Sequence, residues 1–295
     1  MSAPLVSVVV ATDRHSAYLE EALASVAGQT YAAWEGLLVD DGVPDPAALA
    51  EVVARQPGFR LLRTGAHCVS RARNTAVAQA RGRYLAFLDD DDRWHPEHLA
   101  RLVAALEAAP AAVAGCCPVN VVDAEGRLLL AGTPPRRVDA RAVLRRDVWV
   151  ACPNLVVRRD AFAAAGGFDP ALSRAEDLDL ALTLAGLGEV VGVDAPLVDY
   201  RVHGANVTAD RVATAASIGR VVRAHRAAAV AAGRADLVRA HDASLRRNLR
   251  YAAYAVRTAG RRQGTARRRA PARWWWLAGE VVRTPWRVLL PGVAR

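Results

Sequence analysis

Short apolar runs alternate with segments of helical spacing along the first third of the chain. The run LVSVVV at residues 5–10 is rich in β-branched residues and predicts a strand that is buried on both faces. Ser16 is placed to cap the following helix, in which Leu19, Leu23 and Val26 recur at helical spacing. The alternation continues with strands expected at 34–39, 59–62 and 84–88 and helices at 46–55 and 70–80. This pattern predicts an α/β fold with a parallel sheet covered by helices.

Acidic residues stand directly after two of these predicted strands. Asp40 follows the strand at 34–39, and Asp89 follows the strand at 84–88. Ligands of such sheets bind beyond the carboxyl ends of the strands. We therefore expect a ligand site lined by carboxylates at this edge of the sheet.

The rest of the chain is less regular. Strands are expected at 113–117, 119–122, 128–130 and 154–157, with a hairpin turn at 123–126. An amphipathic helix is expected at 176–186, and from about residue 210 the pattern is that of helices rich in alanine and arginine.

Composition excludes several classes of protein. Hydrophobic residues make up 53% of the 295 residues and charged residues 23%, which excludes a disordered chain. The four cysteines have no zinc-ligand spacing and indicate a reducing compartment, so we expect a cytoplasmic protein. The chain contains no stretch of about 18 uncharged apolar residues, and no basic segment precedes the first apolar run. We therefore expect neither a membrane-spanning helix nor a signal peptide.

Charge is distributed unevenly along the chain. Residues 211–295 hold 19 arginines and only three acidic residues, whereas residues 1–210 hold 20 arginines and 27 acidic residues. Within the basic part, residues 273–290 place tryptophans beside arginines, a pattern typical of the membrane–water interface. This tail predicts peripheral attachment to an anionic surface at the inner face of the membrane. Alternatively, the tryptophans pack on the rest of the protein or on a partner subunit.

Four consecutive carboxylates, Asp89–Asp92, follow the predicted strand at 84–88. Two like charges about 4 Å apart repel by about 4 kcal/mol at an effective dielectric constant of about 20. A solvated acidic loop is one interpretation. The position directly after an apolar strand instead favours a compensating cation, and carboxylate oxygens select Mg²⁺ or Mn²⁺. Because Mg²⁺ completes its shell with substrate phosphates, we expect a substrate that carries a diphosphate.

A second acidic pair, Glu176 and Asp177, opens the helix expected at 176–186. Carboxylates are stabilised at a helix start by the positive end of the helix dipole, so capping is one explanation. The alternative is that one of the two faces the ligand site as a general base.

Four segments follow one another along the chain: the segment from Val6 to the VDDG at 39–42, then SRARNTAVAQARGRYLAFLDDDDRWHP, GGFDPALSRAEDLDLALTLA and YRVHGANVT. In this order they resemble segments of the family 2 glycosyltransferases of GT-A fold. The first resembles the strand, helix and strand that form the nucleotide pocket of that family, and the other three resemble its DxD, ED and YRxHxxNxS regions. The resemblance covers about residues 5–210. It implies a GT-A, Rossmann-like catalytic domain at 1–210 with a mixed, mostly parallel sheet, followed by a helical extension at 211–260 and the basic tail at 261–295.

The resemblance also implies roles for residues on the donor side. Asp40 would bind the base of the nucleotide, and Arg73 and Asn74 match the ARN element beside the nucleotide pocket. Asp89 and Asp91 match the DxD motif, in which Asp91 would hold the metal and Asp89 would contact the ribose or the metal.

On the acceptor side, Asp177 matches the catalytic base, with Glu176 beside it in the acceptor site. His203, in contrast, belongs to the donor side, because it matches a residue placed near the diphosphate and the metal. The implied reaction is an inverting, metal-dependent transfer of a sugar from a nucleotide sugar, with UDP as the expected nucleotide. The implied acceptor is a hydroxyl of a glycan or a lipid-linked glycan in cell-surface polysaccharide or glycolipid synthesis.

Two other functions are weighed against this one. A GT-A-like nucleotidyltransferase is disfavoured because no glycine-rich basic loop follows the first strand. A non-catalytic nucleic-acid-binding protein could use the basic tail, but the acidic body argues against it, and no nucleic-acid partner is expected. Asp13 and Arg14 stand where the family often has Tyr-Asn, which leaves the donor open.

Overall fold

The computed structural model describes residues 3–14, 16–134, 138–204 and 206–262. A central sheet of seven strands has the order β10-β6-β9-β4-β1-β2-β3, and a smaller sheet has the order β5-β11-β7-β8. The central strands are β1 (Val6–Thr12), β2 (Trp34–Asp40), β3 (Phe59–Arg63), β4 (Tyr84–Asp89), β6 (Ala112–Cys116), β9 (Leu155–Arg158) and β10 (Glu189–Gly192). The smaller sheet is built from β5 (Arg93–Trp94), β7 (Val119–Val122), β8 (Leu128–Leu130) and β11 (Val198–Arg201).

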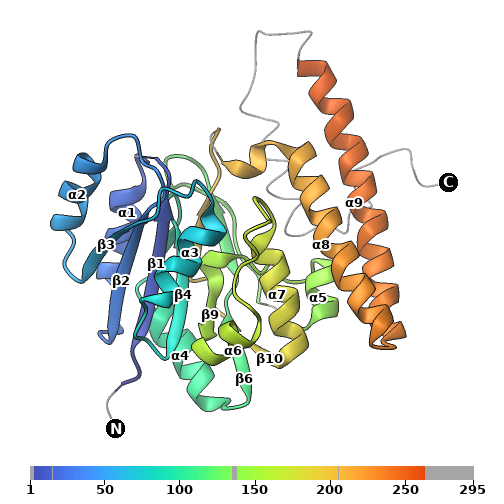
Figure 1. Cartoon of the computed structure of the whole chain (residues 1–295), viewed down its shortest axis with the longest axis horizontal. Helices are drawn as coiled ribbons and strands as arrows, with labels where there is room; N and C mark the ends of the chain where they lie inside the picture. Colours follow the sequence, from blue (N-terminus) through green and yellow to red (C-terminus); the bar gives the residue numbers. More distant parts are fainter. Residues whose placement is uncertain (1–2, 15, 135–137, 205, 263–295) are drawn as a thin grey trace.

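Helices cover both faces of the central sheet (Figure 1). One face packs on α1 (Leu19–Ala27), α2 (Pro46–Ala54) and α4 (His98–Ala108). The other face packs on α3 (Val69–Ala78), α5 (Ala140–Arg145), α6 (Arg159–Ala164), α7 (Glu176–Leu187) and α8 (Arg211–Ala231). Alternate residues of β1 point to opposite faces, so Val8 and Val10 enter one core and Val9 the other. This is the expected mixed, mostly parallel architecture; β9 is the antiparallel strand, between β4 and β6.

Eight of the eleven described strands were predicted, most of them because a strand buried on both faces leaves a continuous apolar run; β5, β10 and β11 were not. The start of the first helix was predicted wrongly at Ser16. Helix α1 begins at Leu19, and the hydroxyl of Ser16 accepts a hydrogen bond from the backbone N–H of Tyr18, 3.1 Å away, before the helix begins. Ser16 therefore stabilises the turn that leads into α1 rather than capping the helix.

Parallel pairing brings the acidic strand ends together. In the register of the sheet, Thr12 of β1 lies opposite Asp40 of β2, and Ala11 lies opposite Asp89 of β4. The smaller sheet then carries the YRVH segment to the same edge, because β11 pairs with β5 directly after the acidic run. Asp199 of β11 fixes this pairing by accepting hydrogen bonds from Arg93 at 2.6 Å and Asn120 at 3.0 Å.

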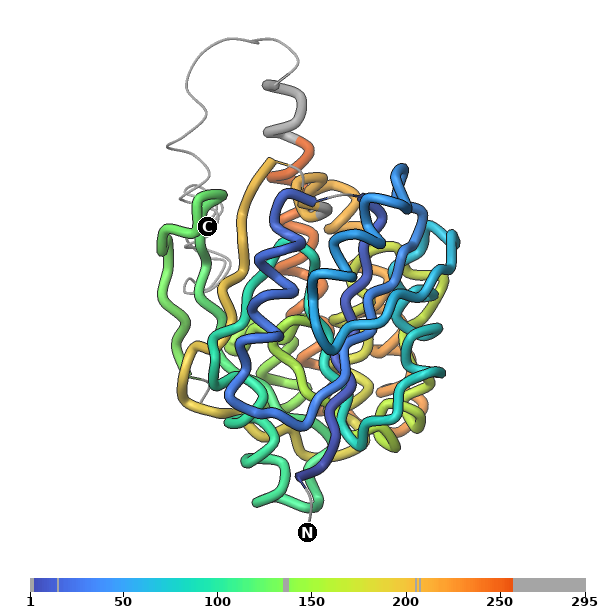
Figure 2. The backbone as a smooth tube through the Cα atoms, turned by 90° about the vertical axis from the view of Figure 1, so that its left-hand side faces the viewer, coloured from blue at the N-terminus to red at the C-terminus, as the bar shows by residue number. Residues whose placement is uncertain are grey.

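The described chain ends in two long helices that form a hairpin, α8 and α9 (Ala235–Arg262) (Figure 1). In Figure 2, which views the molecule from the left-hand side of Figure 1, they lie behind the strands. Ile218, Val221 and Val222 of α8 are buried in the core shared with α7, and Leu245 of α9 packs against the same core. Among the described helices, none has the length and apolar character needed to span a membrane. The tail predicted to meet the membrane, residues 273–290, lies outside the described residues, so that hypothesis stays a prediction from the sequence.

Candidate active site

A cavity of about 590 Å³ opens at the carboxyl ends of β1 and β4. Its lining includes residues 11–14 and 89–91 together with His203 and Asn206. Residues 146–151 and 173–178, part of α8 and Tyr251 of α9 also belong to the lining. The cavity therefore contains both acidic motifs that the sequence singles out.

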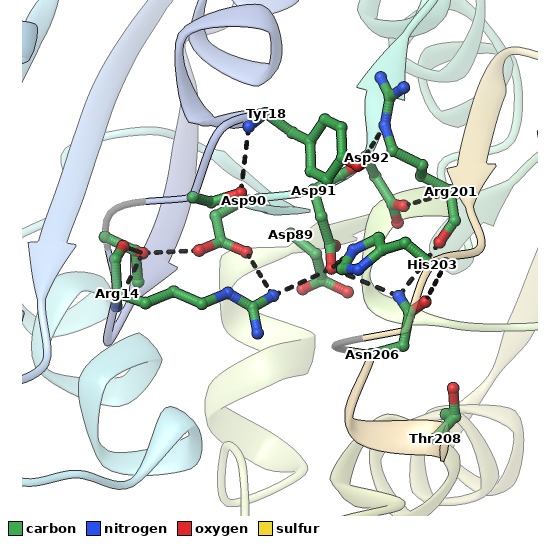
Figure 3. A network of polar contacts seen from close by, with 12 residues as sticks. Arg14, Tyr18, Asp89, Asp90, Asp91, Asp92, Arg201, His203, Asn206 and Thr208 are labelled. Atoms are coloured by element: carbon green, nitrogen blue, oxygen red, sulfur yellow. Dashed lines mark hydrogen bonds and ion pairs between the residues drawn. The ribbon is translucent and has the colours of Figure 1, made fainter. Parts of the chain in front are cut away.

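The four consecutive aspartates point in different directions and have different partners (Figure 3). Asp90 accepts a hydrogen bond from the hydroxyl of Thr12 at 2.6 Å and lies 3.5 Å from Nη2 of Arg14. Asp92 accepts one from the backbone N–H of Arg201 at 2.9 Å, and its second oxygen is buried without a hydrogen-bond partner. Burial raises the pKa of Asp90 to about 6 and, with the neighbouring carboxylates, raises that of Asp92 well above its usual range.

Asp91 lies at the centre of a polar network that faces the cavity (Figure 3). Its Oδ2 atom lies 3.2 Å from Nη2 of Arg14, 3.0 Å from Nε2 of His203 and 3.4 Å from the amide nitrogen of Asn206. The ring of His203 packs against that of Tyr18, with 5.1 Å between the ring centres. The structure thus brings together two of the predicted metal-site residues, Asp91 and His203.

Arg73 joins the two acidic motifs. Its Nη2 atom donates to Asp89 at 2.6 Å, and its Nη1 atom donates to Glu176 at 2.8 Å. The guanidinium also lies over the ring of Phe168, 5.2 Å from its centre. The side chain of Arg73 is only 6% exposed and that of Glu176 12%, whereas that of Asp89 is 34% exposed, so the pair with Glu176 is the better shielded from water. Arg73 was expected beside the nucleotide; in the structure it ties the end of β4 to the start of α7.

Asp177 is available to bind a substrate in the cavity, because Arg73 pairs with the neighbouring Glu176 and not with Asp177. It lines the cavity, and one of its oxygens accepts the backbone N–H of Leu178 at 2.7 Å. Burial, and then the charge of Glu176, raise the pKa of Asp177 to about 7. A carboxyl group with this pKa accepts a proton readily near neutral pH, which suits a general base.

Two residues expected to bind the nucleotide do not line the cavity. Asp40 turns into the loop that follows β2, where it accepts the backbone N–H groups of Gly42 at 3.0 Å and Val43 at 2.9 Å. Its neighbour Asp41 lines the cavity instead. Asn74 donates to the backbone oxygen of Phe168 at 2.8 Å and accepts the N–H of the same residue at 3.0 Å. Both ends of its amide are therefore used to hold the GGF loop in place.

We expect Asn74→Ala to destabilise the fold more than it weakens nucleotide binding. The variant leaves a backbone donor and acceptor of Phe168 without their partner, which costs about 2 kcal/mol or a melting temperature lowered by about 4–8 °C. Thermal unfolding, and calorimetry with a nucleoside diphosphate, measure the two effects. An unchanged melting temperature with a tenfold loss of nucleotide affinity would return Asn74 to the nucleotide site.

Backbone strain is an independent pointer to this cavity. Among the described residues, three that are not glycine lie in the left-handed region: His67 (φ 47°), Arg146 (φ 58°) and Ala175 (φ 62°). All three line the cavity. Such conformations cost of order 1–3 kcal/mol each and cluster at functional sites.

The predicted metal site agrees with the structure only in part. In the part of the chain that the structure describes, no group of three or more His, Cys, Asp or Glu side chains is arranged to hold a metal ion. Arg14 and Arg73 also supply part of the positive charge that the sequence assigned to a metal. Asp91 with His203 nevertheless fits Mg²⁺ or Mn²⁺, because Mg²⁺ commonly takes one or two carboxylates and completes its shell with water and substrate phosphates.

Comparison with known proteins gives the family. Residues 7–165 match the family described as "Glycosyl transferase family 2". The chain belongs to glycosyl transferase family 2. The O-antigen biosynthesis protein RfbC of Myxococcus xanthus is 33% identical over 214 residues, which are 70% of this chain and 16% of RfbC. The UDP-Glc:alpha-D-GlcNAc-diphosphoundecaprenol beta-1,3-glucosyltransferase WfgD of Escherichia coli is 36% identical over 91 residues, or 30% of this chain and 36% of WfgD.

The matched part of the chain thus covers well under half the length of RfbC and of WfgD. Among solved structures, S. aureus TarS 1–349 in complex with UDP-GlcNAc superimposes with a TM-score of 0.60 at 18% identity, over 74% of this chain and 65% of TarS 1–349. The GT-A fold and the family expected from the motifs are confirmed. Membership of a glycosyltransferase family favours that enzyme class over the nucleotidyltransferase and nucleic-acid-binding alternatives.

Several residues of this family 2 site escaped the sequence analysis. Arg14 could have been found, because it follows the first strand directly and stands where the family often has another residue. Asn206 belongs to the quoted YRVHGANVT segment but was given no role. Arg146, Arg211 and Tyr251 belong to no motif, and only the folded chain brings α5, α8 and α9 to one cavity.

Proposed function

We propose that this domain transfers a sugar from a nucleoside-diphosphate sugar to an acceptor hydroxyl, with inversion at the anomeric carbon. The observation that carries the proposal is the bridge made by Arg73, which holds Asp89 and Glu176 at one cavity. The motif proposed to bind the donor, which contains Asp89, and the motif proposed to supply the base, which contains Glu176, therefore face the same cavity. A nucleotide sugar and an acceptor bound together there could contact both motifs.

The donor is assigned to the end of the cavity that holds the acidic run. Asp91 and His203 would hold Mg²⁺ or Mn²⁺ there, and the metal would neutralise charge on the diphosphate as it leaves. Arg14, beside Asp91, adds a second positive charge at this end. Asp89, held by Arg73, is the residue of the motif left to contact the ribose.

Asp177 is assigned the role of base. It takes the proton from the acceptor hydroxyl while that oxygen bonds to the anomeric carbon, and the bond from that carbon to the diphosphate oxygen breaks on the opposite face. A single displacement of this kind inverts the anomeric configuration. Positioning of the two substrates, rather than a covalent intermediate, supplies the rest of the rate enhancement.

The names of the relatives support a role in cell-surface glycan synthesis. RfbC is named for O-antigen biosynthesis, WfgD for a UDP-linked donor and a lipid-linked acceptor, and TarS is solved with UDP-GlcNAc. We accordingly assign a UDP-sugar as donor and a glycan or lipid-linked glycan as acceptor. Attachment of the tail to an anionic membrane belongs to the same hypothesis.

A thermal-shift panel of nucleoside diphosphates and their sugars, with and without Mn²⁺, tests the proposal because a true ligand stabilises the fold by mass action. The nucleotide sugar that gives the largest shift is then assayed for release of its nucleoside diphosphate. If no nucleotide sugar shifts the melting temperature or is turned over, the proposed function is wrong.

We expect Asp91→Ala to abolish the gain in nucleoside-diphosphate affinity that Mn²⁺ gives the wild type, a loss of at least tenfold. Calorimetry with and without Mn²⁺ measures it. Asp90→Asn is the matched control, since Asp90 stands in the same acidic run but bonds to Thr12. A full metal-dependent gain in Asp91→Ala would remove Asp91 from the metal site.

A further inference from the structure

Arg14 contacts the acidic run at the residue assigned to the metal. Its Nη2 atom lies 3.2 Å from Oδ2 of Asp91 and 3.5 Å from Oδ1 of Asp90 (Figure 3). The same Oδ2 atom of Asp91 lies 3.0 Å from Nε2 of His203. A guanidinium group and the proposed metal site therefore share one carboxylate oxygen.

Two cations repel each other when both are held at that oxygen. A guanidinium group is always charged in a protein, so Arg14 cannot lose its charge to make room. A Mg²⁺ ion bound about 2.1 Å from Oδ2 of Asp91 would lie no more than about 5.3 Å from Nη2 of Arg14. Like charges at this distance repel strongly inside a protein. The metal therefore binds weakly unless the guanidinium leaves Asp91.

The side chain of Arg14 is placed to leave. It is 36% exposed, and its two contacts with carboxylates are 3.2 and 3.5 Å long. Arg73, which also pairs with the acidic run, is only 6% exposed and lies 2.6 Å from Asp89. Ion pairs that are open to water contribute little free energy. A ligand can therefore draw Arg14 away from the acidic run, whereas Arg73 is held in place.

The backbone of Arg14 is anchored beside the site. The hydroxyl oxygen of Thr12 lies 3.4 Å from the backbone nitrogen of Arg14 and 2.6 Å from its carbonyl oxygen, which ties Arg14 to the end of β1. Arg14 and residues 89–91 line the same cavity. A guanidinium group that turns away from Asp91 thus stays in the part of the cavity assigned to the diphosphate.

We propose that Arg14 and a divalent metal compete for Asp91 until the donor binds, and that the diphosphate of the donor then draws the guanidinium group to its own oxygens. Guanidinium N–H groups match phosphate oxygens, and Mg²⁺ completes its shell with them. The metal and the diphosphate therefore bind together, and the metal binds weakly alone. The inference rests on the proposed function, because it takes the metal and the diphosphate donor from it. It gives a role to the position where this chain has Asp13-Arg14 and its family often has Tyr-Asn.

Two separate binding measurements on the full chain test the proposal. Electron paramagnetic resonance of free Mn²⁺ gives the affinity for the metal without nucleotide. Calorimetry with EDTA present gives the affinity for UDP, or for the nucleoside diphosphate that the thermal-shift panel selects, without metal. Arg14→Met should bind Mn²⁺ about tenfold more tightly than the wild type and the nucleotide about fivefold more weakly. A variant whose site is merely loosened would bind both more weakly, so the opposite directions of the two changes identify competition.

Three further variants separate the charge of Arg14 from its packing. Arg14→Gln should behave like Arg14→Met, since both remove the cation. Arg14→Lys should keep the affinity for Mn²⁺ within about threefold of the wild type, because an ammonium group still competes for Asp91. Arg101→Met is the matched control, because Arg101 is 41% exposed and pairs with Asp194 at 2.7 Å. It removes the same charge and should leave both affinities within about twofold of the wild type.

Both changes in affinity are required. If Arg14→Met and Arg14→Gln bind Mn²⁺ no more tightly than the wild type, or bind the nucleotide without metal equally well, Arg14 does not compete for Asp91 and the inference is wrong. The proposed function survives that result when the wild type binds and turns over a nucleotide sugar. If the wild type binds no nucleoside diphosphate with or without Mn²⁺, the proposed function itself fails.

Discussion

Asp177→Asn should lower kcat by about 10²–10⁴ while leaving the affinity for nucleoside diphosphate within a few-fold. The amide has nearly the shape of the carboxyl group but cannot take a proton from the acceptor. The donor end of the cavity is untouched, because Asp177 contacts Leu178 and forms no ion pair within the described chain. Steady-state kinetics with the selected nucleotide sugar, together with calorimetry of the diphosphate, measure the two quantities.

The pH dependence of the reaction rate is a second test of Asp177 as the base. Only the deprotonated carboxylate can act as a base, and burial with the charge of Glu176 raises the pKa of Asp177 to about 7. The rate should therefore fall about tenfold per pH unit below 7 and level off above it. The Asp177→Asn variant should lose this dependence.

Asp179→Asn is the matched control for these measurements. Asp179 lies two residues further along α7, but its carboxylate pairs with His225 at 2.9 Å. The control should keep kcat within a few-fold of the wild type. If Asp177→Asn instead loses nucleotide binding and turnover in equal measure, Asp177 is a donor-site residue and the base lies elsewhere.

The strands and the acidic strand ends could be predicted because both are local properties of the sequence. Val8, Val9 and Val10 must be apolar in succession, since each face of the sheet is covered by helices. Asp89 must stand at the site because it directly ends β4, and parallel strands share one edge for their carboxyl ends.

Partners distant in the sequence could not be predicted in the same way. Arg73 reads as one arginine on a helix, and nothing near it shows that its guanidinium will meet both Asp89 and Glu176. The contacts of Asn74 could not be predicted either: its place in a quoted motif suggested a ligand contact, and in the structure its amide pairs with the backbone of Phe168. The directions of the Arg73 and Asn74 side chains depend on how α3 packs against the loop before α7. The pattern of residues along the chain does not predict that packing.

The largest effect on stability is expected from Arg73→Met. Removing the cation leaves the buried Glu176 and the one-third-exposed Asp89 without their partner, and breaking a buried pair such as that of Arg73 with Glu176 costs about 3–5 kcal/mol of unfolding free energy. For a domain of this size, that corresponds to a melting temperature lowered by roughly 10 °C. Arg55→Met is the control, since its pair with Glu20 is more than half exposed and should contribute below about 1 kcal/mol.

A double variant separates the loss of charge balance from the loss of packing. If the uncompensated carboxylates cause the instability, Arg73→Met combined with Glu176→Gln should be more stable than Arg73→Met alone, with a coupling of at least about 1 kcal/mol. Arg73→Lys should fall between wild type and Arg73→Met, because one ammonium group cannot reproduce the two-pronged contact with both carboxylates. Chemical denaturation of these variants, of Glu176→Gln alone and of the wild type measures these differences, since the coupling requires both single variants. A melting temperature for Arg73→Met within 2 °C of the wild type would show that the bridge contributes little to the fold, and would leave the juxtaposition of the two acidic motifs to the packing of α3 and α7 against the sheet.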